Sequence, residues 1–132
     1  MTNHGATHKR YSLGRLLFRI ARSRVGALMI GWSFAYMHAW IPVDRLYETE
    51  LVMAFYHPQP QHKVHILIVP KRQLRTLLMV TEADMPVIHH VITTAQHLVK
   101  ELALEAKGFR LIVNGGEYQD VLQIHWHLIS DE

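Results

Sequence analysis

A single long helical repeat, set between segments that read as strands, is the feature that most restricts how this chain folds. Between residues 88 and 102, apolar side chains recur with the period of an amphipathic α-helix. The repeat consists of Ile88, Val91, Ile92, Ala95, Leu98, Val99 and Leu102. Thr81, followed by two acidic side chains, predicts the start of this helix, because a hydroxyl cap and acids suit a first turn. Gly108 is expected to end the helix.

Strand-forming segments lie on both sides of this repeat. Residues 45–57 predict two short strands or a hairpin, and "VHILIVP" at 64–70 is a β-branched run closed by proline. "FRLIVNGG" at 109–116 reads as a strand that enters a flexible loop, and "VLQIHWHLI" at 121–129 as the last strand. This order predicts an α+β domain, with an antiparallel sheet of about five strands and the helix packed on one face.

The composition supports one globular domain and excludes several kinds of site. With 132 residues, of which 49% are hydrophobic and 19% charged, the chain suffices for one core. It contains no cysteine, which excludes disulfides, thiolate metal sites and a cysteine nucleophile. A metal ion would need histidine and carboxylate ligands.

Positive charge is concentrated near the N-terminal end. Before Asp44 there are six basic residues and no acidic one, whereas the remainder has eight basic and eleven acidic residues. We therefore divide the chain into a basic extension, residues 1–29, and a domain, residues 30–132. Residues 11–25 predict a basic amphipathic helix, which would lie on an anionic membrane surface or pack against the domain or a second subunit. The acidic domain argues against specific nucleic-acid binding.

The uncharged run at residues 26–43 is about as long as a minimal membrane span. Gly31, Ser33, His38 and Pro42 interrupt its apolar character, which argues against a span. We therefore expect a cytoplasmic protein whose membrane association is limited to peripheral contact through the N-terminal helix.

Two histidines in the last predicted strand carry the clearest chemical signal. Because side chains alternate along a strand, Gln123, His125 and His127 are expected on one face, with Ile124 and Trp126 on the core side. Imidazoles in such a row can hold a phosphate, bind a metal, or divide the work of nucleophile and acid. From the spacing alone, an ordinary half-exposed polar face remains an alternative.

Several motifs, in order, resemble the histidine triad family of nucleotide hydrolases and transferases. The pattern is "VHILIVPK" followed by "NGGEYQDVLQIHWHLI", and the similarity reaches back to "WSFAYMHAWIPVDRLYETE", so that it covers residues from about 30 to 129. The family signature has three histidines at alternate positions, preceded by Gln-x-Val. Gln119 and Val121 match the Gln-x-Val, and His125 and His127 match the second and third histidines. His65 matches a histidine of an upstream strand.

The resemblance implies an antiparallel sheet with a long helix, a homodimer formed through that helix and neighbouring strands, and a purine-nucleotide pocket in each subunit. It also implies attack by His125 on the α-phosphorus, giving a nucleotidyl-histidine that water or another acceptor resolves. His127 would hold the phosphate oxygens or the leaving group, while His65 and Gln123 would belong to the same catalytic site. No metal or other cofactor is required. The nucleotide-binding and phosphate-binding residues expected are Asn114, Gly116, Gln119, Asp120, Val121 and His57.

Three positions depart from the family pattern. Gln123 replaces the first histidine of the triad, and its backbone carbonyl is still expected to orient His125. His57 stands where many members hold the ribose hydroxyls with an aspartate. Asp120 replaces a serine near the phosphate, and a carboxylate beside a phosphate dianion is unfavourable unless a cation intervenes or the side chain turns away.

These departures leave two alternatives to a hydrolase or transferase of the phosphoramidate or dinucleoside polyphosphate class. One is a non-catalytic module that binds a purine nucleotide. The other is a metal-binding protein that uses His65, His125 and His127 as ligands.

Overall fold

The computed structural model describes residues 44–132. The expectations for the amphipathic helix at 11–25, the apolar run at 26–43 and the boundary between extension and domain lie outside the described residues. Within residues 44–132, no helix is both long enough and apolar enough to cross a bilayer.

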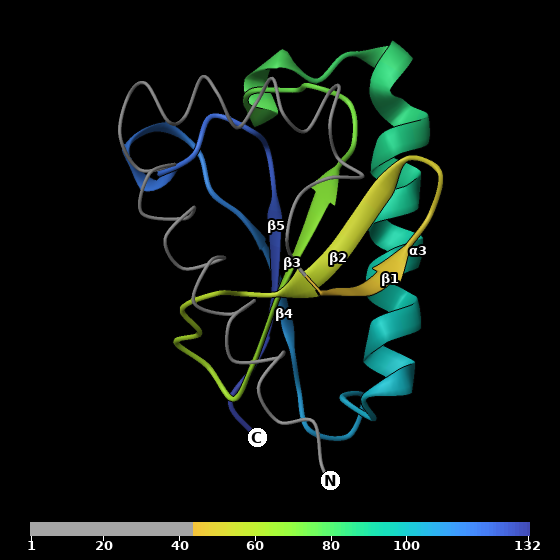
Figure 1. Ribbon diagram of the computed structural model, residues 1–132, viewed down its shortest axis with the longest axis vertical. Coiled ribbons are helices and arrows are strands. Elements are labelled where there is room, and N and C mark those ends of the chain that lie inside the picture. The colour runs from red at the N-terminus through yellow and green to blue at the C-terminus, as the bar shows by residue number, and fades with distance from the viewer. Residues whose placement is uncertain (1–43) are drawn as a thin grey trace, which may run out of the picture.

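Five antiparallel strands form one sheet, as the sequence predicts (Figure 1). Their order across the sheet is β1-β2-β3-β5-β4. The strands are β1 (Arg45–Glu48), β2 (Val52–Tyr56), β3 (Val64–Pro70), β4 (Arg110–Val113) and β5 (Trp126–Ser130). β3, which the sequence places at the same residues, lies at the centre of the sheet, and β5 joins it to β4.

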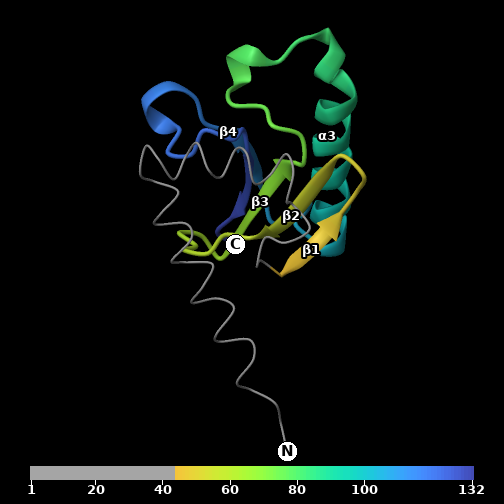
Figure 2. The same ribbon diagram turned by 45° about the horizontal axis from the view of Figure 1, so that its top comes forward.

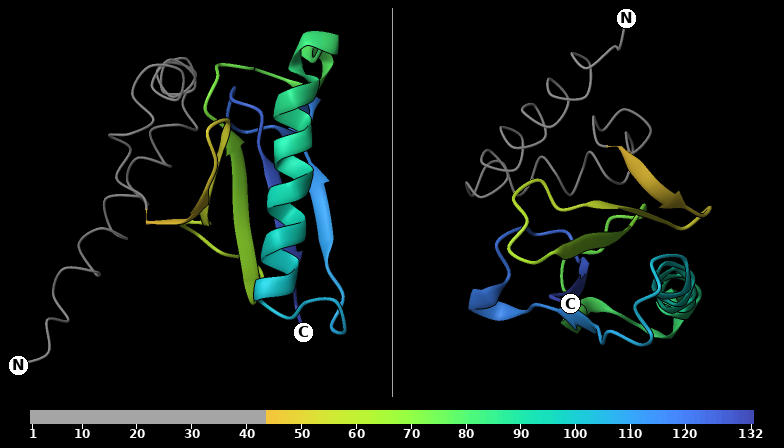
Figure 3. Two further views of the ribbon diagram at one scale, coloured as in Figure 1. Left: turned by 90° about the vertical axis from the view of Figure 1, so that its right-hand side faces the viewer. Right: turned by 90° about the horizontal axis from the view of Figure 1, so that it is seen from below.

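One long helix, α3 (Met85–Glu101), packs on a single face of the sheet (Figures 1 and 3). The short 3₁₀ turn η3 (Glu82–Asp84) leads into it, and the backbone N–H of Thr81 donates to the Asp84 carboxylate at 2.9 Å, as in a capping box. Thr81 therefore caps the turn η3, whereas α3 itself begins at Met85, four residues later than the predicted start.

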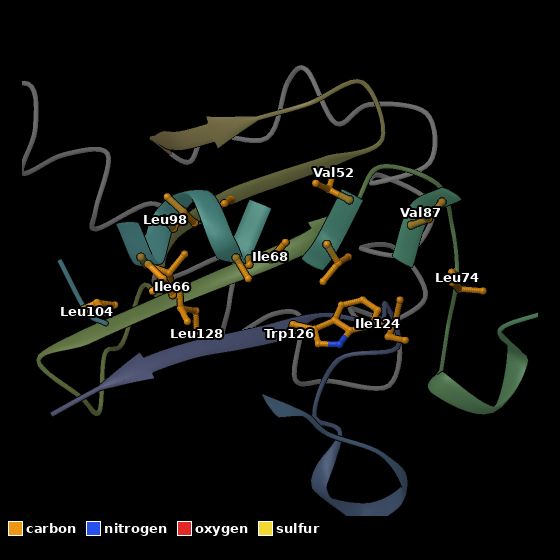
Figure 4. Packing of buried hydrophobic residues seen from close by; sticks show 14 residues of the cluster. Val52, Ile66, Ile68, Leu74, Val87, Leu98, Leu104, Ile124, Trp126 and Leu128 are labelled. Carbon is orange, nitrogen blue, oxygen red and sulfur yellow. The ribbon is translucent and has the colours of Figure 1, made fainter. Parts of the chain in front are cut away.

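The core lies between α3 and the sheet (Figure 4). Ile66 and Ile68 of β3 and Leu128 of β5 are fully buried against Val91 and Leu98 of the helix. Because side chains alternate along each strand, the neighbours of these residues on β3 and β5, which include His65 and His127, face the opposite side of the sheet. These two histidines therefore lie on the face away from the helix.

The helix ends earlier than the sequence predicts, and the expectation that Gly108 ends it is wrong. α3 stops at Glu101, and Ala103 adopts the left-handed conformation with φ 53°. The N–H of Ala103 bonds to the carbonyl of Lys100, and that of Leu104 to the carbonyl of Val99, which is a Schellman motif. Alanine stands at the position that glycine usually occupies, so no glycine in the sequence indicates where the helix ends. Gly108, with φ 89°, belongs to the following turn.

The last strand is also shorter than predicted, because it begins at Trp126 rather than at Val121. The preceding segment does not extend the ladder with β3. Its backbone N–H at Ile124 donates to the carbonyl of Leu74 at 2.8 Å, which ties it to the loop that follows β3. Two further 3₁₀ turns, η2 (Leu77–Met79) and η4 (Gly116–Tyr118), lie in the loops at this end of the sheet (Figure 2).

Candidate active site

Five histidines gather around one cleft on the face of the sheet opposite α3. The cleft has a volume of about 720 Å³, counting its open mouth. The histidines come from β5 and the residue before it, from β3, and from the loop between β2 and β3. The lining residues are His57, Gln61, His62, His65, Ile112, Asn114, Tyr118, Asp120, His125, His127 and Ile129.

His125 is oriented by a single hydrogen bond to the main chain. Its Nδ1 lies 2.7 Å from the carbonyl oxygen of Gln123, and a carbonyl only accepts, so Nδ1 carries the hydrogen. The neutral ring therefore has its lone pair on Nε2. This is the form in which an imidazole acts as a nucleophile. The expected role of the Gln123 carbonyl in orienting His125 is confirmed.

His65 and His127 are joined by a second, directional hydrogen bond. Nδ1 of His65 accepts the backbone N–H of Gln61 at 3.2 Å, so the hydrogen of the neutral ring lies on Nε2. That Nε2 lies 2.9 Å from Nδ1 of His127 and donates to it. His127 consequently carries its own hydrogen on Nε2, which lies 3.5 Å from Nδ2 of Asn114. Because Nδ2 is itself a donor, the Asn114 amide has to turn its oxygen toward Nε2 to accept this hydrogen. The pair thus presents an N–H donor at His127, close to the lone pair of His125.

Burial keeps these rings uncharged near neutral pH. Desolvation, aided by the nearby His62, lowers the pKa of His65 to about 4. Desolvation, with smaller effects of His125, His65 and His62, lowers the pKa of His127 to about 4. The pKa of His125 is lowered by desolvation, and the Gln123 carbonyl and Asp120 oppose that change. All three rings are therefore neutral at pH 7, as the hydrogen-bond directions require.

His57 stacks on His65, with ring centroids 4.2 Å apart. Its backbone N–H donates to the carbonyl of His65 at 2.8 Å, and its Nδ1 accepts the N–H of Gln59 at 2.9 Å. His57 is 9% exposed, so it forms part of the cleft wall. Like His65, it presents an N–H donor on Nε2.

Within the described residues, one histidine group has the spacing of a metal site, but its hydrogen bonds disfavour a metal. The ligand atoms of His57, His65 and His127 lie within 4.8 Å of one another. This set contains His57 in place of His125, unlike the set expected from the sequence. A metal-bound imidazole normally donates its second nitrogen's hydrogen to an acceptor. In His57 and His65 the second nitrogen instead faces a backbone N–H donor, which leaves the hydrogen on the nitrogen that a metal would need.

Six of the residues expected from the sequence line the cleft together: His57, His65, Asn114, Asp120, His125 and His127. Four others lie outside its lining: Gly116, Gln119, Val121 and Gln123. Val121 is buried, Gly116 belongs to the turn η4, and the Gln119 amide donates to the carbonyls of Arg75 and Val121. These residues shape the loop from which Asp120 enters the cleft.

The position of Gln123 departs most from the expectation. Its side chain is 1% exposed and turns away from His125 into the loop after β3. There Oε1 accepts the N–H of Leu74, and Nε2 donates to the carbonyls of Pro70 and Arg72. The alternation of a strand does not apply to this residue, because β5 begins three residues later. Gln123 thus supports the site from outside the cleft.

Sequence reasoning did not identify Tyr118, Ile112 or Ile129 as lining residues. Ile112 faces His127 across the pair formed by β4 and β5, and Ile129 follows two residues later on the same face. Strand pairing places both side chains there, and register is not visible in one sequence. Tyr118 is 84% exposed and stands at the cleft margin. The sequence feature that could have identified Tyr118 is an aromatic side chain in a glycine-containing loop.

Comparison with known families gives one clear match. A family model described as the HIT domain matches residues 39–132. The purine nucleoside phosphoramidase of Escherichia coli is 34% identical over 92 residues, which cover 68% of this chain and 77% of that protein. An uncharacterised HIT-like protein of Synechococcus elongatus is also 34% identical over 92 residues, covering 68% of this chain and 80% of its own.

Solved structures agree with the observed fold. A histidine triad protein from Clostridium difficile superposes with a TM-score of 0.70 at 30% identity, covering 78% of this chain and 90% of that one. A HIT family hydrolase from Legionella pneumophila gives a TM-score of 0.70 at 28% identity, covering 75% and 90%.

Proposed function

This chain belongs to the HIT family, and from that premise we propose that it cleaves nucleotide conjugates at the α-phosphate through a nucleotidyl intermediate on His125. The observation that carries the proposal is the hydrogen bond of 2.7 Å between Nδ1 of His125 and the Gln123 carbonyl. It leaves the lone pair of Nε2 available inside the cleft. An imidazole held in this form needs no further base to act as a nucleophile.

In the first step, Nε2 of His125 forms a bond to phosphorus, and the bond from phosphorus to the leaving group breaks. The leaving group, which obtains its proton from solvent, keeps the electron pair. His125 becomes an N-phosphorylated imidazolium, whose positive charge the Gln123 carbonyl stabilises through Nδ1–H. In the second step, water or another acceptor attacks phosphorus. The electron pair of the N–P bond returns to Nε2, which restores the neutral ring.

The other imidazoles supply hydrogen-bond donors to the phosphoryl oxygens. His127 carries its hydrogen on Nε2, because its Nδ1 accepts from His65. A donor fixed in advance by this bond stabilises charge that develops in the transition state without reorganising. Gln61, His65 and His127 thus form a directed row that begins at a backbone N–H.

A purine nucleotide conjugate is the substrate that we propose. The name of the Escherichia coli relative, purine nucleoside phosphoramidase, supports this class. The cleft also provides an apolar wall at Ile112 and Ile129 beside the histidines, against which a base or ribose can pack.

Hydrolysis of adenosine and guanosine 5′-phosphoramidates tests the proposal. The wild type is expected to turn over at least one of them and to form a nucleotidylated protein, detected by mass spectrometry after rapid acid quench. His125→Ala is expected to lose both activities by about a thousandfold or more. His89→Ala, which changes an exposed histidine on α3, is the matched control and is expected to retain activity.

A binding module without catalysis is the competing function. The replacement of the first triad histidine by Gln123 favoured it at the level of sequence, but that side chain lies outside the cleft lining. The absence of turnover, together with protection of the fold by a bound nucleotide, would contradict the proposed enzyme and support the binding module.

A further inference from the structure

The charges lining the cleft are unusual for a site that handles phosphate. Among the described lining residues there is no lysine or arginine, and Asp120 is the one carboxylate. Sites for phosphate groups are commonly built with fixed cations or backbone N–H groups, which offset the phosphate charge. This cleft relies on imidazoles instead.

The hydrogen bonds of three imidazoles leave them uncharged in the free protein. Nδ1 of His57 and Nδ1 of His65 each accept a backbone N–H, and Nδ1 of His127 accepts from His65. A ring that accepts at one nitrogen carries a single hydrogen and no net charge. Of the other two rings, His125 donates from Nδ1 to the Gln123 carbonyl, and His62 contacts the carboxylate of Asp131 at 2.9 Å. Among the described residues that line the cleft, Asp120 is the one that brings a carboxylate group.

Asp120 lies beside the nucleophile. It lines the same cleft as His125, and its negative charge acts directly on that ring. A carboxylate there repels an additional anion, and the repulsion grows with the number of phosphate charges near it. The same carboxylate attracts a cation in the same place. The position therefore distinguishes leaving groups by charge.

We propose that Asp120 is a specificity-determining residue that favours a leaving group carrying positive charge, the N-protonated amine of a phosphoramidate, over the polyphosphate of a P–O–P conjugate. The inference rests on the proposed function and goes beyond it by assigning this choice to one residue. The carboxylate accepts a hydrogen bond from the protonated nitrogen attached to phosphorus. It therefore stabilises the form of the substrate in which that nitrogen is a good leaving group.

The step balances in atoms and electrons. The nitrogen of the bound substrate already carries the extra proton, and the pair of the P–N bond goes to it, releasing a neutral amine. His125 forms the new N–P bond through Nε2. Water then attacks phosphorus, the N–P pair returns to Nε2, and the proton lost by water is taken up by the amine in solution. Asp120 accepts a hydrogen bond from this nitrogen and does not itself transfer the proton.

Asp120→Asn, compared across two substrates, tests the proposal. For adenosine 5′-phosphoramidate the variant is expected to lower kcat/KM by about tenfold or more. For diadenosine polyphosphate it is expected to leave kcat/KM unchanged or to raise it. Glu117→Gln removes an exposed acid from the same loop without altering the cleft lining, and it is expected to change neither value. A change by the same factor for both substrates, or no change for either, overturns the assignment.

A binding measurement separates failure of this inference from failure of the proposed function. If the wild type turns over neither substrate, the catalytic proposal fails, and calorimetric titration with AMP, a dianion, still tests Asp120. Removing the carboxylate charge is expected to tighten AMP binding by about tenfold in Asp120→Asn and not in Glu117→Gln. An unchanged dissociation constant for AMP in Asp120→Asn overturns the inference.

Discussion

Gln123 shows how one residue supports the proposed nucleophile, His125, from outside the cleft. Its side chain holds the loop after β3 through three hydrogen bonds, while its carbonyl orients His125. The role expected from the histidine triad pattern, a group beside the phosphate, is replaced by a structural one. An amide suits that role because it offers both an acceptor and two donors, whereas a neutral imidazole offers one of each.

Gln123→Ala is expected to lower the free energy of unfolding by about 3 kcal/mol, because three backbone partners, two of them buried, lose their hydrogen bonds. The same change is expected to lower kcat/KM, since the carbonyl that aligns His125 sits on the freed segment. Urea denaturation and phosphoramidate hydrolysis measure the two effects. Gln73→Ala is the control, because it removes an exposed amide from the loop after β3, which the Gln123 side chain contacts. A fully stable and active Gln123→Ala would show that the hydrogen bonds are dispensable.

The lowered pKa values of His65 and His127 predict that the stability of the protein depends on pH. Their pKa values are about 4 in the folded protein, against 6.5 for an unperturbed imidazole. Between these values the unfolded chain binds more protons, so the free energy of unfolding is highest above pH 6.5 and falls as the pH drops toward 4. The combined loss is on the order of 2 kcal/mol, reduced because the cleft is open to solvent.

Urea denaturation at several values between about pH 4.5 and 7.5 measures this dependence. His65→Gln and His127→Gln remove the titrating groups and are expected to flatten the profile. A slope that is the same in the wild type and in the double variant would contradict the assignment to these two rings.

At the scale of elements, the sequence predicted most of what forms the fold and less of how the elements end. The helical repeat and the β-branched run 64–70 identify α3 and β3 directly, because burial on one face or both leaves a regular pattern. The ends of α3 and β5 depend on local hydrogen bonds made by Ala103 and Gln123. Neither alanine nor glutamine is typical of such a role, so the predicted end of α3 and the predicted start of β5 were wrong.

The same distinction holds for the site. His65, His125 and His127 were identified because alternation and the family motif place them together, and the structure brings all three to one cleft. Ile112 and Ile129 were missed because their position depends on the register between β4 and β5.

Ala103→Gly is expected to stabilise the protein by about 0.5–1 kcal/mol, because glycine adopts the left-handed conformation without the steric cost that alanine pays there. Thermal or urea unfolding measures the change. Ala106→Gly is the matched control, since Ala106 is an exposed turn residue outside the left-handed region. It is expected to destabilise the protein slightly, because glycine adds entropy to the unfolded chain. Equal effects of the two changes would argue against strain at Ala103.

At the scale of the whole molecule, we predict a homodimer. Among the described strands, β4 pairs on one side with β5 and has no partner on the other, and edge strands of this kind favour pairing between chains. Ile92, on α3, is 43% exposed despite its place in the helical repeat. A second subunit that packs on this helix would cover it.

Sedimentation or light scattering is expected to give twice the chain mass of 15.4 kDa. Ile92→Arg is expected to lower the dimer fraction at micromolar concentration, because it places a charge in an apolar interface. Gln73→Arg, at an exposed position in the loop after β3, is expected to leave the dimer fraction unchanged. A monomeric wild type would contradict the prediction.

The hydrogen between His65 and His127 also gives the cleft a spectroscopic signature. It lies between two nitrogens 2.9 Å apart, and His65 is 6% exposed, so exchange of this hydrogen with water is slowed. Such a proton resonates far downfield in a nuclear magnetic resonance spectrum, apart from the amide signals. A ligand that accepts a hydrogen bond from Nε2–H of His127 polarises the hydrogen bonds of Gln61, His65 and His127 and shifts that resonance. Occupancy of the cleft can therefore be followed by a single line, for any compound and without turnover.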